Sequence, residues 1–247
     1  HEGDLISMDQ RGIPPVQLEE VDPQKRAFGI LARVAQARSI VYGWLALSFY
    51  EPNEALHRAL VDGTLAAELT ACTVWLGRDQ QLMLPGIEGL AAAATCELGA
   101  LVAEHQRLFG KSIDRVSPCE STYRWKGAGD ILSEAGDLQR GLQQLYSQFG
   151  VSPVEGPVDH IAVQMEFMAY LCQREAREWQ AGAAQAARQL RREESGFLAD
   201  HPGKWVPEFY RRLSGQARSS FYTVAASLAD RWLELEQGPD YGSVRAA

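Results

Sequence analysis

The sequence is poor in cysteine, and its cysteines are not spaced for a metal site or a disulfide framework. There are four among 247 residues, and they lie far apart, at Cys72, Cys96, Cys119 and Cys172. No Cys-x-x-Cys pair and no Cys/His run at zinc-ligand spacing occurs. We expect four unpaired thiols, buried as small apolar groups, in a protein that stays in a reducing compartment.

The chain also lacks a membrane-spanning run and an excess of positive charge. The apolar run Ile40–Phe49 is too short to cross a bilayer, and the alanine-rich stretch after Leu90 is interrupted by Glu97. Lysine and arginine number 24 against 32 aspartates and glutamates, which argues against a nucleic-acid surface and favours a basic partner. The start carries Glu2 and Asp4 and no basic segment before an apolar block, so we expect a cytoplasmic protein without an export signal or stable membrane insertion.

What the sequence does contain is helical periodicity, without strand-like alternation or a fixed repeat. Residues 1–24 are polar and proline-containing, and we expect them to form a mobile tail. The turn-rich segment Gly150–Val158 marks a boundary between two helical parts, over residues 25–154 and 155–240, which can count as one domain. The sequence therefore predicts an all-α bundle of roughly ten helices in two parts joined by a hinge loop.

Glycine and proline set the bounds of the individual helices. The strongest amphipathic stripe follows the hinge, with apolar residues at three- and four-residue steps from Ile161 to Trp179. The polar, arginine-rich stretch from there to Glu194 gives no helix prediction. Helices are predicted at about 24–51, 55–61, 65–76, 86–109, 137–149, 161–179, 205–213 and 221–235.

Residue types that could support catalysis or bind a metal are scattered. Glu54 and His57 have the Glu-x-x-His spacing of di-iron bundles, but no second pair exists, and a solvated surface pair explains them. No Gly-x-Ser-x-Gly elbow and no Gly-rich phosphate loop occurs. A Cys/His pairing of Cys119 with His105 or His160 stays open from sequence. We expect no catalytic residue and no metal site.

Two short segments have both a structural and a functional interpretation. Ser117 and Glu120 match a capping box, in which each side chain binds the other residue's amide. Asp159 is either the N-cap of the next helix, worth roughly 1 kcal/mol, or part of an acidic hinge that receives a basic peptide together with His160. His105 lies on the apolar face of its helix, where a histidine is ordinarily a core residue.

Several segments, in this order, resemble the TorD/DmsD/NarJ family of redox-enzyme maturation chaperones. The resemblance covers roughly Arg26 to Leu235. The segments are Glu104–Gly110 (EHQRLFG), Ser117–Tyr123 (SPCESTY), Pro157–Ile161 (PVDHI), Gln164–Met168 (QMEFM) and a later stretch from Phe197-Leu198 to Trp205-Val206-Pro207.

The resemblance implies a two-part, all-helical TorD-like fold and a function. Members of the family bind the twin-arginine leader or N-terminal segment of a molybdopterin-containing catalytic subunit, hold it back from export and help it to receive its cofactor. Pro157, Asp159 and His160 match the hinge motif implicated in leader binding, and Glu166 is a second acid for a leader arginine. The remaining residues carried over to the peptide-binding site are Leu108, Phe109, Ser121, Tyr123 and His105.

The resemblance also implies a partner, the catalytic subunit of a molybdoenzyme of the dimethyl sulfoxide reductase superfamily. His105 and Cys119 stand where the family usually has aromatic residues, which points to a client outside the best-known branches. The chain is expected to be no enzyme and to hold no cofactor, with at most transient contact with the molybdenum cofactor or guanine nucleotide. A helical adaptor for another protein and a helical metal-dependent enzyme stay open, as do a monomer and a hinge-swapped dimer.

Overall fold

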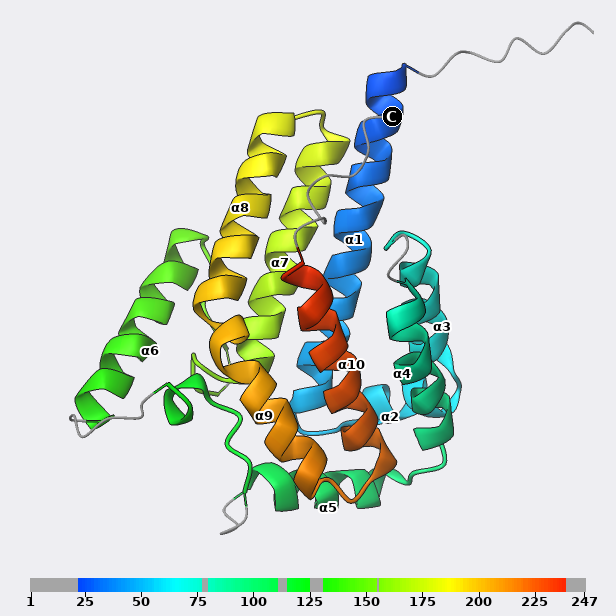
Figure 1. Cartoon of the computed structure of the whole chain (residues 1–247), viewed down its shortest axis with the longest axis vertical. Coiled ribbons are helices and arrows are strands. Elements are labelled where there is room, and N and C mark those ends of the chain that lie inside the picture. Colours follow the sequence, from blue (N-terminus) through cyan, green and yellow to red (C-terminus); the bar gives the residue numbers. More distant parts are fainter. Residues whose placement is uncertain (1–21, 77–79, 111–114, 125–130, 155, 239–247) are drawn as a thin grey trace, which may run out of the picture.

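The computed structural model describes residues 22–76, 80–110, 115–124, 131–154 and 156–238, and these confirm the predicted all-α class (Figure 1). In these ranges there are ten α-helices, one 3-10 turn and no strand, and none of the helices is long and apolar enough to cross a membrane. All four cysteines are free, as predicted, but only Cys72 and Cys172 are buried; Cys96 and Cys119 are partly exposed because they lie in segments between helices. The elements are α1 (Pro23–Phe49), α2 (Glu54–Val61), α3 (Thr64–Thr73), α4 (Gln80–Ala93), α5 (Leu98–Phe109), the 3-10 turn η2 (Glu120–Thr122), α6 (Ile131–Gln148), α7 (Ile161–Gln180), α8 (Ala184–Asp200), α9 (Pro202–Gln216) and α10 (Ser220–Glu236).

The first helix begins inside the segment predicted to be a tail. The carboxylate of Asp22 accepts the N–H of Gln24 at 2.9 Å, and Pro23 occupies the first helical position, where no N–H is needed. The helix therefore starts two residues before the predicted boundary, and residues 1–21 of the predicted tail lie outside the described residues. Its end, before Pro52, agrees with the sequence.

The single helix predicted over residues 86–109 is two helices, α4 and α5, separated by residues 94–97. A Cβ atom on Gly86 would lie 2.8 Å from Leu228, and one on Gly89 would lie 2.9 Å from Val224. These glycines let α4 lie close against α10, whereas α5 turns across the lower end of the bundle (Figure 1). A continuous apolar stripe could not indicate the break, because both helices bury an apolar face.

One hydrophobic core joins the helices on both sides of residue 154. α1 packs along α7, and α10 packs along α4, so that helices far apart in sequence are neighbours (Figure 1). The ring of Tyr42 in α1 meets Trp232 in α10 edge to face, with centroids 5.4 Å apart, and Phe49 meets Phe209 of α9 at 5.5 Å. Both predicted parts thus contribute to the same core.

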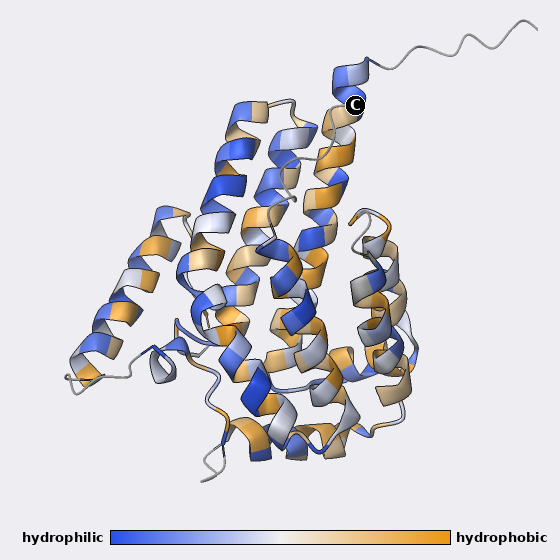
Figure 2. Ribbon diagram, in the orientation of Figure 1, coloured by the Kyte–Doolittle hydropathy of each residue, from blue (hydrophilic) through white to orange (hydrophobic). Residues whose placement is uncertain are grey.

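α8 forms over the polar stretch that gave no helix prediction, and Figure 2 shows hydrophilic residues along much of it. Its buried residues form a narrow stripe, namely Ala187, Leu190, Glu194, Phe197 and Leu198. The stripe contains a glutamate that is 0% exposed. A carboxylate in that position requires partners inside the bundle.

The partner is Arg38 of α1, which is also buried and which binds carboxylates from three other helices. Its Nη1 lies 2.8 Å from Glu175 of α7, and its Nη2 lies 2.6 Å from Glu194 of α8 and 2.7 Å from Glu236 of α10. Arg191 of α8 joins this cluster at 3.1 Å from Glu194 and 3.5 Å from Glu236. A single guanidinium therefore ties four helices to one another.

This cluster holds two arginines and three glutamates, so with every group ionised it carries one excess negative charge. Burial raises the pKa of Glu175 to about 7, and the neighbouring Glu194 adds to the rise. Burial would also raise the pKa of Glu236, but Arg38 and Arg191 outweigh it and hold that pKa below its ordinary value. Glu175 is therefore the member of the cluster that takes up a proton near neutral pH.

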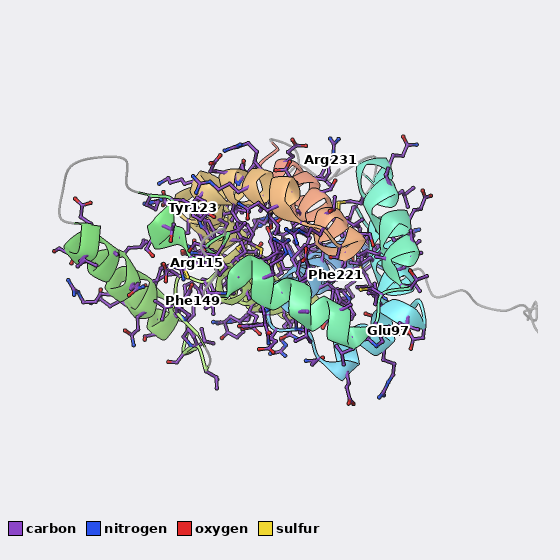
Figure 3. All side chains as sticks on the ribbon, turned by 90° about the horizontal axis from the view of Figure 1, so that it is seen from below. Glu97, Arg115, Tyr123, Phe149, Phe221 and Arg231 are labelled. Atoms are coloured by element: carbon purple, nitrogen blue, oxygen red, sulfur yellow. The ribbon has the colours of Figure 1, made fainter. Side chains whose placement is uncertain are left out.

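α5 lies across the lower end of the bundle, which Figure 3 shows from below with Glu97 beside the start of the helix. Glu104 fixes α5 to the start of α10, because its Oε1 accepts the backbone N–H groups of Arg218 at 2.6 Å and Ser219 at 3.3 Å. Its other oxygen pairs with Arg107 at 2.7 Å. These contacts hold the second half of α5 beside the start of α10.

Replacing Arg38 by leucine should lower the free energy of unfolding by roughly 3–5 kcal/mol, because three buried carboxylates would be left with one arginine. Urea unfolding measures the loss. The matched control is Arg26→Leu on the exposed face of the same helix, which should change stability by less than about 0.5 kcal/mol. Equal, small losses in the two variants would contradict the assigned role of Arg38.

Glu175 should make the protein less stable as the pH rises. Its pKa in the folded chain is about 7, above the ordinary 4.5, so the stability it contributes is complete below pH 4.5 and is lost as the pH rises through 7. Glu175→Gln should remove this decline, leaving the variant at least as stable as the wild type at pH 8. Urea unfolding between pH 5 and 8 tests it, and parallel pH profiles for the two proteins would contradict it.

Candidate functional site

Backbone hydrogen bonds join the end of the hinge segment, residues 157–161, to the segment that contains η2. The N–H of Glu120 donates to the carbonyl of Asp159 at 3.0 Å, and the N–H of Ile161 donates to the carbonyl of Pro118 at 2.8 Å. Cys119 and His160 thereby form an isolated antiparallel bridge. Two of the family-like segments, far apart in the sequence, are in direct contact through their backbones.

Asp159 does not cap α7, so the structural alternative for this residue is wrong. Its side chain is 0% exposed and points toward η2 and α6. One oxygen accepts the backbone N–H of Ser121 at 3.0 Å, and the other accepts the amide Nε2 of Gln139 at 3.1 Å. In the described part of the chain no cation lies within 4.0 Å of it. Asp159 is therefore a buried carboxylate that is hydrogen-bonded but has no counter-charge.

His160 occupies the cap position instead. Its Nδ1 accepts the N–H of Ala162 at 3.1 Å, and its ring is nearly parallel to that of Tyr50, with centroids 6.1 Å apart. Burial lowers the pKa of His160 to about 4, although the nearby Asp159 opposes the shift. The imidazole is therefore neutral at pH 7 and supplies no positive charge to the hinge.

Glu166 lies one and a half turns along α7 and is exposed at the rim of a pocket. It accepts the hydroxyl of Tyr50 at 2.8 Å, so the end of α1 helps to orient it. The pocket has a volume of about 160 Å³ and lies between α6, α7 and the hinge segment. It is lined mainly by apolar and aromatic side chains, namely Tyr146, Val151, Ser152, Pro153, Val163, Glu166, Phe167 and Tyr170.

The predicted residues of α5 belong to the apolar interior and its edge. Leu108 is 0% exposed. Phe109 is half-buried and meets the rings of Phe49 and Tyr222. His105 packs on Phe109 with centroids 5.0 Å apart, its Nε2 lies 3.5 Å from the carbonyl oxygen of Phe49, and burial lowers its pKa. His105 therefore takes an aromatic position in this cluster, as its place on an apolar face indicates.

The other predicted residues lie around the hinge. Ser121 contributes its backbone N–H to Asp159, and Pro157 is exposed and accepts the N–H of His160 at 3.0 Å. Tyr123 donates its hydroxyl to the carbonyl of Ser117 at 2.8 Å and stacks on Trp205 of α9. The structure thus gathers the hinge residues and η2 at one place, whereas Leu108 lies in the core beneath.

The predicted capping box at Ser117 and Glu120 is wrong. Glu120 is 0% exposed and accepts the amide of Gln164 at 2.5 Å, with His201 at 3.1 Å. The hydroxyl of Ser117 instead contacts the hydroxyl of Thr122 at 2.7 Å. The pattern misled because a single 3-10 turn forms there, and the side chain of its glutamate turns inward to Gln164 of α7 and to His201 between α8 and α9.

The catalytic and metal alternatives find no support in the geometry. His57 binds the carbonyl oxygen of Cys96 at 2.9 Å. Burial raises the pKa of Cys119 to about 12, far from the thiolate that nucleophilic catalysis needs. Among the described residues, no group of three or more His, Cys, Asp or Glu side chains is arranged to hold a metal ion.

Three residues of this site could not be identified from the sequence, because no motif or spacing marks them. Gln139 is a polar residue on a predicted amphipathic helix, and its bond to Asp159 joins elements 20 residues apart. Tyr50 follows α1 and reaches Glu166, 116 residues later. Tyr146 donates its hydroxyl to the carbonyl of Val158 at 3.0 Å.

Comparison with known proteins identifies the family. The model of the nitrate reductase delta subunit family matches residues 78–211, which are more than half of the chain. The matched region includes both segments that are joined by backbone hydrogen bonds, at η2 and at the hinge. The chain belongs to this family. The match confirms the resemblance to the TorD/NarJ chaperones, and it places the hinge, η2 and α7 within the matched region.

Three relatives carry informative names. A perchlorate reductase assembly chaperone protein of Dechloromonas aromatica is 23% identical over 204 residues, which are 80% of this chain and 87% of the relative. The chaperone protein TorD of Vibrio cholerae is 25% identical over 210 residues, 82% of this chain and 91% of its own. A selenate reductase assembly chaperone protein of Thauera selenatis is 32% identical over 125 residues, 48% of this chain and 61% of the relative. The names describe chaperones, which agrees with the prediction that this chain is not an enzyme.

The imidazole of His160 should titrate far below an ordinary histidine. Its folded pKa is about 4 against 6.5, so the stability that it contributes is present above pH 6.5 and is lost as the pH falls through 4. NMR titration of the histidine ring resonances should show one midpoint near 4. That resonance should be absent from His160→Gln, and a midpoint near 6.5 for it would contradict the buried, neutral cap.

Proposed function

We propose that this protein is an assembly chaperone for a molybdenum-containing reductase subunit, and that it binds the twin-arginine leader or N-terminal region of that subunit at the hinge. The observation that carries the proposal is Asp159, a buried carboxylate without a cation, close to an apolar pocket with an acidic rim. Two of the relatives are named as reductase assembly chaperones and the third as chaperone protein TorD, which supports the same function.

Electrostatics favours an arginine-containing ligand at this place. A guanidinium can form two parallel hydrogen bonds with a carboxylate, and a hydrogen bond to a charged group contributes about 1.5–3 kcal/mol. Asp159 gives one such partner, and Glu166 at the pocket rim gives a second for an adjacent arginine. The formal charge of −8 also favours the approach of a basic peptide.

The pocket supplies the apolar part of the contact. Its lining includes Val151, Val163 and Phe167. The pocket lies between α6 and α7, with Glu166 in its lining. Burying one leucine-sized side chain of a leader there contributes about 1.5–3 kcal/mol. A micromolar complex needs about 8 kcal/mol in total, so two charged pairs and one apolar anchor are of the right size.

The remaining features of the proposal concern the client. We take it to be the catalytic subunit of an enzyme of the dimethyl sulfoxide reductase superfamily, held in the cytoplasm until its cofactor is inserted. The chaperone keeps no cofactor of its own, and its contact with the molybdenum cofactor or a guanine nucleotide is transient. Release of the mature client requires moderate affinity, which a monomer with one such site provides.

Isothermal titration with the twin-arginine leader peptide of a molybdoenzyme subunit encoded beside this chain tests the proposal. We expect micromolar binding to the native peptide and binding at least tenfold weaker when both arginines are alanine. Asp159→Asn, which keeps the shape of the side chain, should weaken native-peptide binding about tenfold or more, because a charge-assisted pair is lost. Glu166→Gln should weaken it as well.

The control is Asp62→Asn in the turn between α2 and α3, an exposed aspartate far along the chain from the hinge. It should bind the peptide like the wild type, and circular dichroism should give the same helical content for all variants. Equal affinity for the native and the alanine peptide, or failure of the wild type to bind either, would overturn leader recognition.

A further inference from the structure

Asp159 differs from every other buried carboxylate in the described part of the chain. The others each have a cationic nitrogen within 4.0 Å: Glu104 pairs with Arg107, Glu120 with Arg124, and Glu175, Glu194 and Glu236 with Arg38. Asp159 has the N–H of Ser121 and the amide of Gln139. A buried carboxylate without a cation is unfavourable, so this position gains most from a guanidinium that comes from elsewhere.

Gln139 occupies the side of Asp159 that such a guanidinium would use. Ser121 donates from the rigid backbone of η2, which is itself hydrogen-bonded to the hinge, and cannot be withdrawn without breaking that contact. Gln139 donates from a side chain with three rotatable bonds, on a helix that stands at the side of the bundle (Figure 1). Of the two donors, the glutamine is the one that can leave.

The attachment of α6 supports this difference. The helix is held mainly through its second half, where Leu142 is buried and Tyr146 contacts the ring of Phe167 at 4.8 Å and donates to Val158. In its first half Leu132 is 85% exposed to solvent, and Leu138 and Gln139 are only partly buried. A rotation of the Gln139 side chain, or a small displacement of the first half of α6, frees one oxygen of Asp159 while Tyr146 keeps the helix in place.

We propose that Gln139 is a neutral placeholder for the client's arginine: it satisfies Asp159 in the free chaperone and is displaced when a guanidinium arrives. The inference rests on the proposed function. The exchange is favourable because a guanidinium brings a positive charge to Asp159 and can form two parallel hydrogen bonds with its carboxylate, whereas the amide of Gln139 donates one hydrogen bond and carries no charge. It also selects for arginine, since a ligand with no cation gains nothing by breaking the amide bond to Asp159.

A merely structural role for Gln139 predicts a different outcome. If its amide only fastened α6 to the hinge, any substitution would loosen the site and weaken peptide binding. A placeholder competes with the ligand, so its removal strengthens binding, and its replacement by a cation blocks binding. Two variants with opposite expected effects therefore separate the two roles.

The experiment measures the affinity of the native leader peptide for Gln139→Ala and Gln139→Arg by isothermal titration. Gln139→Ala should bind about 2- to 10-fold more tightly than the wild type, because a competing neutral hydrogen bond is removed. Gln139→Arg, whose own guanidinium can pair with Asp159, should bind at least tenfold more weakly. Gln144→Ala, at an exposed position on the same helix, is the matched control and should bind like the wild type.

A second probe makes the result independent of leader recognition. The acetylated Arg-Arg dipeptide amide, added at millimolar concentration, should shift the NMR resonances of Asp159 and Ser121 more strongly in Gln139→Ala than in the wild type, and not at all in Gln139→Arg. Arginine-dependent leader binding with no change in the Ala and Arg variants, or weaker binding in both, would overturn the placeholder and leave the proposed function in place. Loss of all arginine-dependent binding, with neither probe recognised by any variant, would overturn both.

Discussion

The buried charge of Arg38 is the constraint on which the arrangement of the helices depends. Its guanidinium binds glutamates of α7, α8 and α10, so four helices must meet at one point for any of these charges to be satisfied. Desolvation offsets much of the attraction in a buried ion cluster, so its net contribution to stability is small compared with the cost of separating its members. The cluster therefore acts mainly by making other packings of the same helices unfavourable, while the aromatic core supplies the bulk of the burial energy.

The hinge uses the opposite arrangement of charge. Every carboxylate around Arg38 has a cation, whereas among the described residues the side chain of Asp159 is held by one backbone N–H and the Gln139 amide. The neighbouring His160 is neutral at pH 7 because burial lowers its pKa to about 4. Each carboxylate of the cluster at the centre of the bundle thus has an arginine partner within the chain, while the described part of the chain offers the carboxylate of Asp159 no such partner. The proposed recognition of a basic peptide rests on this contrast more than on the motif itself.

The helices that could be predicted from the sequence are those whose own periodicity is strong. α7 and α10 follow their apolar stripes, and α1 follows its stripe once Asp22 and Pro23 set its start. The break between α4 and α5 and the existence of α8 could not be predicted. In the first case the apolar stripe continues through the break, and close packing on α10 at Gly86 sets the direction of α4. In the case of α8, the buried face includes Glu194. A glutamate on a polar helix predicts a surface position unless its buried partner, Arg38, is known.

By itself the sequence determined the all-α class, the free cysteines and the family, because these depend on local periodicity, cysteine spacing and ordered motifs. Tertiary structure alone decided which charges are paired. The sequence predicts that Asp159 is either a helix cap or part of an acidic hinge and that Glu120 is half of a capping box. Both side chains instead turn inward. The reason is physical: the availability of a buried carboxylate depends on groups within a few ångströms, and here those groups include residues 20 to 81 positions away along the chain.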